Sequence, residues 1–469
     1  MIQRHFLAIA AMTLTLAAIQ AWGAGFALYE NSSRGTAICG AFVARADDAS
    51  ALFYNPSGIT QLEGRQISTG TNTYTGLVDI YYPGGGLEAV KDKTWFVPNF
   101  YMSQQVTDKI WFGLGVFAPY GLGNAYNEDW FGRYNMYSAE IACMEINPNI
   151  AIKVNDSFSF AFGVSRQSFE TTSKRKLNPK NVVIEGLVTG SPALGLDPMS
   201  LPEARLFYQY NQDTLFSTVN SFPDIDQEVA VEKPGYRFNL SFRYQINDKM
   251  AFGMNYRSKI AYSLTGDIRY QNVPEALGMN EVLYDSKIAV NISLPDIYVI
   301  GFSYKITDNL TVEADIVRTL WSRYDKVDYH FQNGVGTQYV PEGVPIAERT
   351  PIKLPLTDKT EWSDVNCYRF GAEYQMNSDL TVRLGYLFDE SPLHDNYVDF
   401  ALPGNDRHLF TTGFGYKYKK FIIDGHYGLV ICIDRENPPN LNPNAFIDYN
   451  WEHQKSYTHQ LGFNVSYIF

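Results

Sequence analysis

The chain has 469 residues, of which 38 are Lys or Arg and 50 are Asp or Glu, so its formal net charge is −12 at pH 7. This acidic balance argues against a nucleic-acid partner, because proteins that bind nucleic acids gather positive charge to contact phosphates. The four cysteines, Cys39, Cys143, Cys367 and Cys432, show no CxxC spacing and no close pairing with histidine, which leaves metal sites without support. Isolated buried thiols are expected, although a disulfide in an oxidising compartment remains open.

The first residues have the features of a secretory signal. Arg4 precedes an apolar run over residues 6–19, and the small residues Ala21 and Gly23 stand three and one positions before Ala24. Residues 1–23 are therefore predicted to be a signal peptide that is removed on export. No later segment approaches the ~18–20 continuous apolar residues of a membrane helix.

Residues 24–63 do not alternate between apolar and polar side chains. They are too apolar and too rich in Gly and Ala for a solvated linker. We interpret them as a plug that folds inside the remainder of the chain, and a disordered periplasmic extension is the alternative. Asn55 and Pro56 are predicted to fix a turn that holds this plug to its surroundings, since proline sets φ and asparagine bonds its own backbone. A purely structural role for the pair is the other interpretation.

Alternating strands follow. Between residues 236 and 246 every even residue is apolar and every odd residue is polar, and after a turn at residues 247–249 the alternation resumes through residue 257. A period of two places each set on one face of a strand. This stretch therefore predicts a β-hairpin with one wholly apolar face.

The short turn recurs along the chain, at residues 107–109, 155–157, 247–249, 307–309, 377–379 and 419–420. Six turns join twelve strands, and single strands near residues 65–80 and 457–469 complete an even set of fourteen. The other connections are longer, notably residues 171–230, 327–361 and 434–455. Short turns on one rim and long loops on the other predict an all-β, 14-stranded antiparallel transmembrane β-barrel over residues 64–469. A soluble β-sandwich is the alternative, but it would bury the apolar face.

Composition agrees with a barrel in the outer membrane of a Gram-negative bacterium. Aromatic residues make up 15% of the chain, which suits two interfacial girdles around a lipid-facing band. The last strand alternates and ends on Phe469, which resembles the signal read by the barrel-assembly machinery. Outer-membrane lipid and that machinery are therefore expected partners, and a monomer is the expected state.

The third strand, residues 110–118, carries Gly113 and Gly115 and stops at Pro119. Glycine weakens a strand and marks bends or close approach, and proline cannot donate a ladder hydrogen bond. The pattern predicts that this third strand is irregular. The alternative is that the two glycines only make room for side chains of the plug.

Several short motifs follow one another along the chain, namely Ala24-Gly25-Phe26, Ala46-Asp47-Asp48-Ala49 with Tyr54-Asn55-Pro56-Ser57, Ala118-Pro119-Tyr120-Gly121-Leu122 with Trp130-Phe131-Gly132-Arg133-Tyr134, Ile146-Asn147-Pro148-Asn149, Leu294-Pro295-Asp296, Trp321-Ser322, and Asp389-Glu390-Ser391-Pro392 with Asn405-Asp406-Arg407. Together these motifs resemble the FadL/TodX family of outer-membrane transporters for hydrophobic compounds. Ser57 departs from the pattern, since the family usually has Ala there. The motifs span the mature chain in family order.

The resemblance implies an amino-terminal hatch inside the barrel and transport of hydrophobic ligands without ATP. It implies capture at an extracellular groove, passage to an inner pocket near the hatch terminus, and sideways exit at a kinked third strand, here Gly113, Gly115 and Pro119. Phe26 is the candidate gate residue. The apolar loop at residues 187–206, with Leu194 and Leu196, is the candidate capture element, either as a helical lid or as a loop packed on its neighbours.

A fatty-acid carboxylate would require a cationic partner in the apolar lumen. By alternation, four arginines point inward, namely Arg243, Arg257, Arg369 and Arg383. They are candidates for that role, and pairing with the inward acids Glu313, Asp315 and Glu373 is the alternative. The family's carboxylate-binding positions do not map cleanly, because the end of the fifth strand reads Phe169-Glu170-Thr171. An uncharged hydrocarbon would need no such partner.

An enzymatic role has no support, because GxSxG, HExxH and P-loop patterns are absent from the sequence. No catalytic residue, metal ligand or cofactor is therefore predicted. The expected partner is a hydrophobic small molecule, with long-chain fatty acids favoured. Aromatic hydrocarbon uptake and a structural or adhesive barrel are the alternatives.

Overall fold

The computed structural model describes residues 25–82, 86–91, 93–189, 199–214, 216–277, 279–281, 283–331, 356–394, 404–434 and 453–469. Within these ranges no helix is both long enough and apolar enough to cross a membrane.

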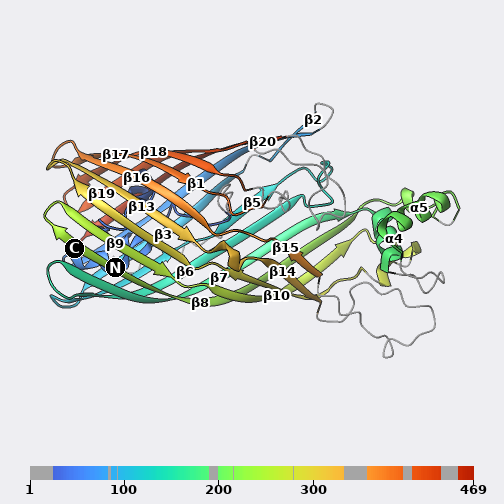
Figure 1. Ribbon diagram of the computed structural model, residues 1–469, viewed down its shortest axis with the longest axis horizontal. Helices are drawn as coiled ribbons and strands as arrows, with labels where there is room; N and C mark the ends of the chain where they lie inside the picture. The colour runs from blue at the N-terminus through green and yellow to red at the C-terminus, as the bar shows by residue number, and fades with distance from the viewer. Residues whose placement is uncertain are drawn as a thin grey trace, which may run out of the picture.

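The strands form a closed antiparallel barrel, which confirms the predicted fold (Figure 1). Its fourteen barrel strands are here called staves, because several of them consist of two shorter strands in succession. The staves are, in chain order, β1 (Arg65–Tyr82), β3 (Thr94–Gln105), β4 (Ile110–Phe117) with β5 (Gly121–Ala125), β6 (Ser138–Lys153), β7 (Phe158–Leu177), β8 (Ile225–Asn247), β9 (Met250–Arg257) with β10 (Ile260–Gln271), β11 (Ser286–Leu294) with β12 (Ile297–Lys305), β13 (Leu310–Thr319) with β14 (Lys326–Phe331), β15 (Leu356–Lys359) with β16 (Val365–Gln375), β17 (Leu380–Asp389), β18 (Arg407–Tyr418), β19 (Phe421–Cys432) and β20 (His453–Ile468). A short strand, β2 (Gly86–Ala89), pairs back on β1.

The barrel closes where its first and last staves meet. β1 pairs with β20 over sixteen positions, from Gln66 opposite Ile468 to Tyr81 opposite His453. The terminal residue Phe469 extends this contact, since its N–H donates to the carbonyl of Arg65 at 3.0 Å. Closure leaves both termini of the barrel domain on the rim that carries the short turns.

The short turns share one physical design. In three of them an asparagine side chain accepts hydrogen bonds from the backbone N–H groups two and three residues later, at 2.8–3.0 Å, namely Asn155, Asn247 and Asn377. Thr107 and Thr307 use their hydroxyl oxygens in the same way. Lys419 instead adopts a φ of +57° in a two-residue turn. A side chain that bonds its own backbone fixes a tight reversal, which is why these residue types marked the turns in the sequence.

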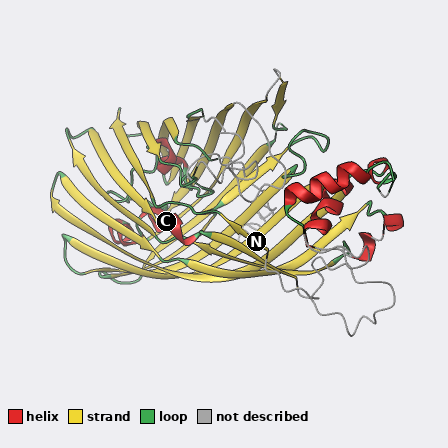
Figure 2. Ribbon diagram, turned by 45° about the vertical axis from the view of Figure 1, so that its right-hand side comes forward, coloured by secondary structure: helices red, strands yellow, loops and turns green. Residues whose placement is uncertain are grey.

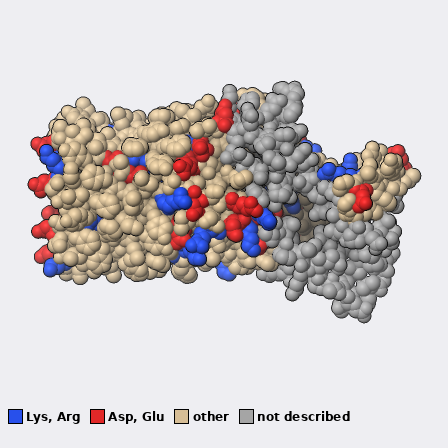
Figure 3. Space-filling view, viewed as in Figure 1, with Lys and Arg blue, Asp and Glu red and all other residues tan. Residues whose placement is uncertain are grey.

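The outer surface is apolar along the middle of the barrel. On β7, Phe160, Phe162 and Val164 are exposed, and they stand opposite outward apolar residues of β8. Figure 3 shows this flank as a broad band almost free of charged side chains, with Asp, Glu, Lys and Arg at the short-turn rim and again toward the other end. Such a band with charged edges fits a lipid bilayer, because lipid-facing charges are costly.

Strands extend further into the predicted loops than the sequence indicated. β7 continues to Leu177 and β8 begins at Ile225, so the connection predicted over residues 171–230 is shorter at both ends. Its described part holds α4 (Pro179–Thr189), α5 (Leu201–Asn211) and η3 (Val219–Ser221). These helices share a small apolar core that includes Ile184, Leu187 and Tyr208. Figure 1 shows them beyond the strand ends, opposite the short turns.

The remaining short helices position the site described below. α2 (Ser33–Ala37), α3 (Ala51–Tyr54) and η1 (Pro56–Gln61) precede β1, η4 (Glu275–Leu277) and η5 (Met279–Glu281) follow β10, and η6 (Trp321–Arg323) follows β13. All four cysteines are buried free thiols, as the sequence predicted.

Candidate functional site

Residues 25–63, here called the amino-terminal segment, lie against the inward faces of the strands. α2 contacts β17 to β20, and η1 contacts β4, β6, β7 and β8, which lie on different sides of the barrel. Figure 2 shows short helices within the curve of the sheet. Nearly every residue of the segment from Gly25 to Ile59 is buried. The segment therefore fills the interior at the short-turn half of the barrel.

Wall carboxylates hold the backbone of this segment. Asp315 on β13 accepts hydrogen bonds from the N–H groups of residues 42 and 43, at 2.9 and 3.1 Å. Two residues earlier on the same inward face, Glu313 accepts from the N–H groups of residues 44 and 45, at 2.7 and 3.3 Å. Four consecutive backbone donors outside any helix are thus satisfied by two side chains, as burial requires.

Asn55 makes the predicted turn and also reaches the wall. Its amide nitrogen donates to the carbonyl of Val43 at 2.7 Å and to the carbonyl of Phe242 on β8 at 3.0 Å. Its side-chain oxygen accepts from the Ser57 hydroxyl at 2.7 Å and caps η1, whose first residue is Pro56. The side chain therefore links two parts of the segment to one stave. The hydroxyl of Ser57, where the family usually has Ala, takes part in this turn.

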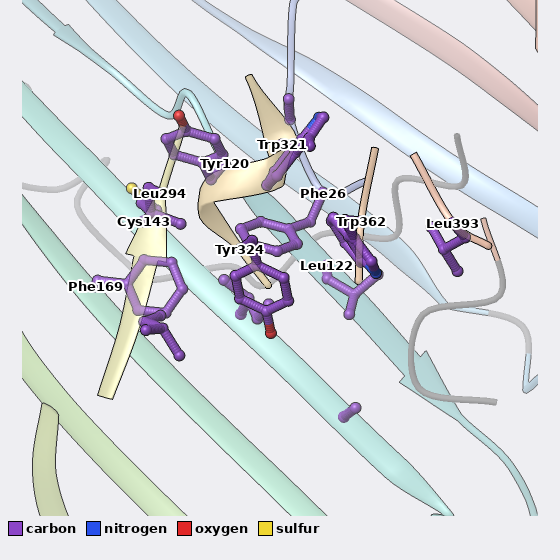
Figure 4. Close-up of a cluster of buried hydrophobic side chains, with 14 of the residues drawn as sticks. Phe26, Tyr120, Leu122, Cys143, Phe169, Leu294, Trp321, Tyr324, Trp362 and Leu393 are labelled. Atoms are coloured by element: carbon purple, nitrogen blue, oxygen red, sulfur yellow. The ribbon is translucent and has the colours of Figure 1, made fainter. Parts of the chain in front are cut away.

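Phe26 lies at the other end of the segment, in a cage of aromatic side chains (Figure 4). Its side chain has no exposed surface. Five rings surround it, at centroid distances of 5.0 Å for Trp321, 5.5 Å for Tyr324, 5.7 Å for Tyr120, 6.0 Å for Trp362 and 6.3 Å for Phe169. Tilted and edge-to-face contacts at these distances are the favourable geometries for aromatic pairs. We call these five residues the aromatic cage.

Gly25 allows the chain to enter the aromatic cage. Its φ is +68°, and a Cβ at this position would lie 2.6 Å from Trp321 and 2.9 Å from Trp362. Any other residue would be strained and would also collide with the indole rings. Glycine before Phe26 is therefore required for the ring to be seated.

The amino-terminal segment also pairs with an interruption in the third stave. β4 ends at Phe117 and β5 begins at Gly121. Across this break the N–H of Leu28 donates to the carbonyl of Pro119 at 2.9 Å, and the N–H of Gly121 donates to the carbonyl of Phe26 at 3.0 Å. The side chain of Asn31 accepts from the N–H of Ala118 at 3.2 Å. The segment thus supplies partners for backbone groups that leave the sheet.

The ladder between the second and third staves is incomplete at the same level. β3 pairs with β4 only as far as Phe100 opposite Val116, and within the described ranges the ladder of β5 is with β6. Trp95 on β3 covers this position, because a Cβ on Gly123 would lie 2.6 Å from its indole ring. Leu28 packs into the same small cluster as Trp95, together with Tyr74, Val97 and Ala118.

Gly113 and Gly115, predicted to mark the irregular strand, lie in β4, between the short turn and the break. A Cβ on Gly113 would lie 2.2 Å from the Leu52 side chain and 3.0 Å from Ile59, and one on Gly115 would lie 2.9 Å from Phe117. Gly113 thus accommodates the amino-terminal segment, which is the alternative that the sequence left open. The strand ends at Phe117, two residues before Pro119.

All four arginines predicted to point inward are bonded to the amino-terminal segment or to wall acids. Arg243 donates to the carbonyl of Ala44 at 2.8 Å, Arg257 to the carbonyl of Phe53 at 2.8 Å and to Glu145 at 2.9 Å, Arg369 to the carbonyl of Gly40 at 3.3 Å, and Arg383 to Glu373 at 2.5 Å and Asp424 at 2.7 Å. These contacts favour a structural role for the four side chains.

Sequence reasoning did not single out three members of the aromatic cage, Tyr324, Trp362 and Phe169, as site residues. Tyr324 and Trp362 lie in connections between strands, where alternation gives no signal. Sequence reasoning also did not single out Arg237, although the alternation of β8 places this side chain on the inward face. Leu194 and Leu196 lie outside the described residues, between α4 and α5.

The family model described as outer membrane protein transport protein (OMPP1/FadL/TodX) matches residues 14–431. The chain belongs to this family of transporters, and it is an outer-membrane protein of a Gram-negative bacterium.

Individual proteins of known sequence or structure are also similar to this chain. The chain is 27% identical over 437 residues to a putative outer membrane protein of Neisseria meningitidis serogroup B, covering 88% of this chain and 86% of that protein. It is 21% identical over 428 residues to the long-chain fatty acid transport protein of Escherichia coli O6:H1, covering 87% of each. A FadL homologue of Pseudomonas aeruginosa superposes with a TM-score of 0.74 at 17% identity, covering 95% of this chain and 99% of that one. The toluene transporter TodX of P. putida gives 0.63 at 16% identity, covering 95% and 99%. These two structures support the fold.

Replacing Asn55 by Ala is expected to loosen the amino-terminal segment without opening the barrel. The variant loses the bonds to Val43 and Phe242, and an unsatisfied buried partner costs about 1–3 kcal/mol. Amide hydrogen exchange measured by mass spectrometry should become about tenfold faster or more in residues 43–61. The matched control is Asn309→Ala on an exposed turn, which should leave these amides unchanged. Unaltered exchange in the Asn55 variant would contradict the assigned contacts.

Proposed function

We propose that this protein takes up hydrophobic compounds, with long-chain fatty acids as the favoured class, and that the aromatic cage is its inner ligand site. The observation that carries the proposal is the position of Phe26. A ring from the chain itself occupies a fully buried aromatic compartment, next to a break in the barrel wall. Apolar ligands need such a path because a water-filled pore offers them no favourable site.

In this account residues 24–63 act as a hatch, and Phe26 acts as its gate. The ring holds the place that an apolar ligand would take, and it is part of the strand-like stretch that pairs with Pro119 and Gly121. Displacement of Phe26 would therefore also disturb the contacts that close the third stave. A ligand can drive this change only if it binds the displaced state more tightly than the seated one.

We further propose that the ligand leaves sideways between β3 and β5. The break at residues 118–120, the missing ladder pairs beside β5 and the two prolines, Pro98 and Pro119, support this route. Proline interrupts a ladder because it has no N–H to donate. Inside the barrel, Leu28 of the hatch and Trp95 of β3 cover the opening, so a moving hatch would withdraw one of these two side chains.

Aromatic hydrocarbons are the second candidate class. The aromatic cage already holds a phenyl ring, so a monoaromatic compound of similar size would find the same five contacts. Solved structures of similar fold include the toluene transporters TodX and TbuX, the latter from Ralstonia pickettii with a TM-score of 0.62. Fatty acids remain favoured because several relatives are long-chain fatty acid transport proteins.

Uptake of labelled oleate and labelled toluene, measured in parallel in an outer-membrane host that lacks its own transporter, tests this proposal. We expect the protein to increase oleate uptake over the empty host. An increase with toluene alone would move the substrate class to aromatic hydrocarbons. No increase with either compound, in cells with folded barrel in the outer membrane, would contradict transport and favour a structural or adhesive role.

The sideways route predicts that joining β3 to β5 blocks transport. Cysteines replacing Trp95 and Gly123 would face each other where the indole now lies, and a cleavable bifunctional thiol reagent can connect them. We expect uptake to be abolished after the reaction and restored by reductant. The native thiols are buried and should not compete, and each single-cysteine variant treated in the same way is the control. Full transport through the crosslinked barrel would rule out this exit.

A further inference from the structure

Two buried arginines share one carboxylate beside the aromatic cage, so that the charge of this cluster is unbalanced. Glu145 on β6 accepts a hydrogen bond from Arg257 at 2.9 Å, and Arg237 on β8 lies 3.8 Å from the other carboxylate oxygen. Gln167 on β7 also donates to Glu145, at 2.8 Å. All four side chains are buried.

One carboxylate therefore faces two guanidinium groups. Arginine remains protonated in proteins, so the cluster of Arg237, Arg257 and Glu145 carries one excess positive charge. Neighbouring groups that act on Arg237 include the hydroxyls of Tyr120 and Tyr262 and the thiol of Cys143, which are uncharged at neutral pH. An excess charge in a buried site is costly unless it is paired.

Arg237 differs from Arg243, Arg257, Arg369 and Arg383 in its hydrogen bonding. Among the described residues, none of its three guanidinium nitrogens makes a well-formed hydrogen bond, although all three are inaccessible to solvent. Glu145 is already used by Arg257 and Gln167. A buried guanidinium with five N–H donors and no good acceptor is an exception that requires an explanation.

The position of Arg237 suggests what the acceptor is. The Tyr120 hydroxyl lies beside its guanidinium, and the ring of Tyr120 belongs to the aromatic cage. Phe169, another member of the cage, comes two residues after Gln167 on the inward face of β7. The guanidinium therefore borders the compartment now filled by Phe26, on the side of β6, β7 and β8.

We infer that Arg237, with the Tyr120 hydroxyl, binds the carboxylate of an acidic hydrophobic ligand whose chain occupies the aromatic cage. A carboxylate balances the excess charge and accepts two parallel N–H bonds from a guanidinium. This inference rests on the proposed function, and it names a residue that distinguishes acids from neutral hydrocarbons. It lies on the sixth stave rather than at the end of the fifth, where Phe169-Glu170-Thr171 offers no cation.

The test compares oleate with oleyl alcohol, which has the same chain without the charge. Binding to purified protein in detergent at pH 8 can be followed by the fluorescence of Trp321 and Trp362, which line the site. The wild-type protein should bind oleate at least about tenfold more tightly than oleyl alcohol, since hydrogen bonds to charged groups are the strong ones. Arg237→Met should remove this preference and leave the affinity for oleyl alcohol unchanged, and Arg237→Lys should keep part of it.

Arg166→Met is the matched control, because Arg166 is exposed on the outer face of β7, opposite Tyr236. It removes the same charge and should not alter either affinity. Equal oleate binding by the wild-type protein and Arg237→Met would overturn the inference. So would equal affinity of the wild-type protein for the two ligands, which needs no variant to fold. Failure of the wild-type protein to bind either ligand would instead contradict the proposed function.

Discussion

The structure depends on one constraint. The same short stretch of chain must fill the aromatic cage with a side chain and supply backbone hydrogen bonds to the interrupted third stave. Phe26 is seated among five rings, and its own carbonyl accepts a hydrogen bond from Gly121 on the far side of the break. Leu28, two residues later, donates to Pro119 and packs beside Trp95. In the proposed mechanism, a displacement of the ring would therefore reach the wall through only two residues.

The rest of the interior keeps this arrangement in place. A wide barrel has a lumen that must be filled, and here it is filled by a segment whose backbone is largely non-helical. Its polar groups must be satisfied by the wall, which explains the inward carboxylates of β13 and the inward arginines. Side-chain hydrogen bonds and ion pairs tie residues 30–57 to the wall, whereas the stretch from Gly25 to Leu28 is held mainly by aromatic packing and backbone pairing. This division suits a fixed body with a movable end.

The barrel was predictable because its signals are local. A period of two fixed the faces of β8 and β9, and Asn155, Asn247 and Asn377 marked turns by bonding their own backbone. Strand ends were less predictable, since β7 and β8 continue beyond the membrane band into regions without clean alternation. Phe26, Asn55 and the inward arginines were placed by motif and alternation.

The contacts between distant segments could not be predicted from the sequence. Trp362 and Tyr324 reach the aromatic cage from loops, and Gly113 makes room for Leu52. Both contacts depend on packing across the lumen. Arg237 and Arg257 show the same alternation in the sequence. Only the structure reveals that Arg257 donates well-formed hydrogen bonds, whereas Arg237, among the described residues, has only a loose ion pair with Glu145.

The central claim is that Phe26 occupies the ligand site as a substitute for ligand. It is tested most directly by measuring the affinity of purified Phe26→Ala for oleate and toluene relative to the wild-type protein. If the ring competes with ligand, the account predicts tighter binding by the variant for whichever compound is transported. Weaker binding by a folded variant would show that Phe26 forms part of the wall of the site, and it would contradict the account.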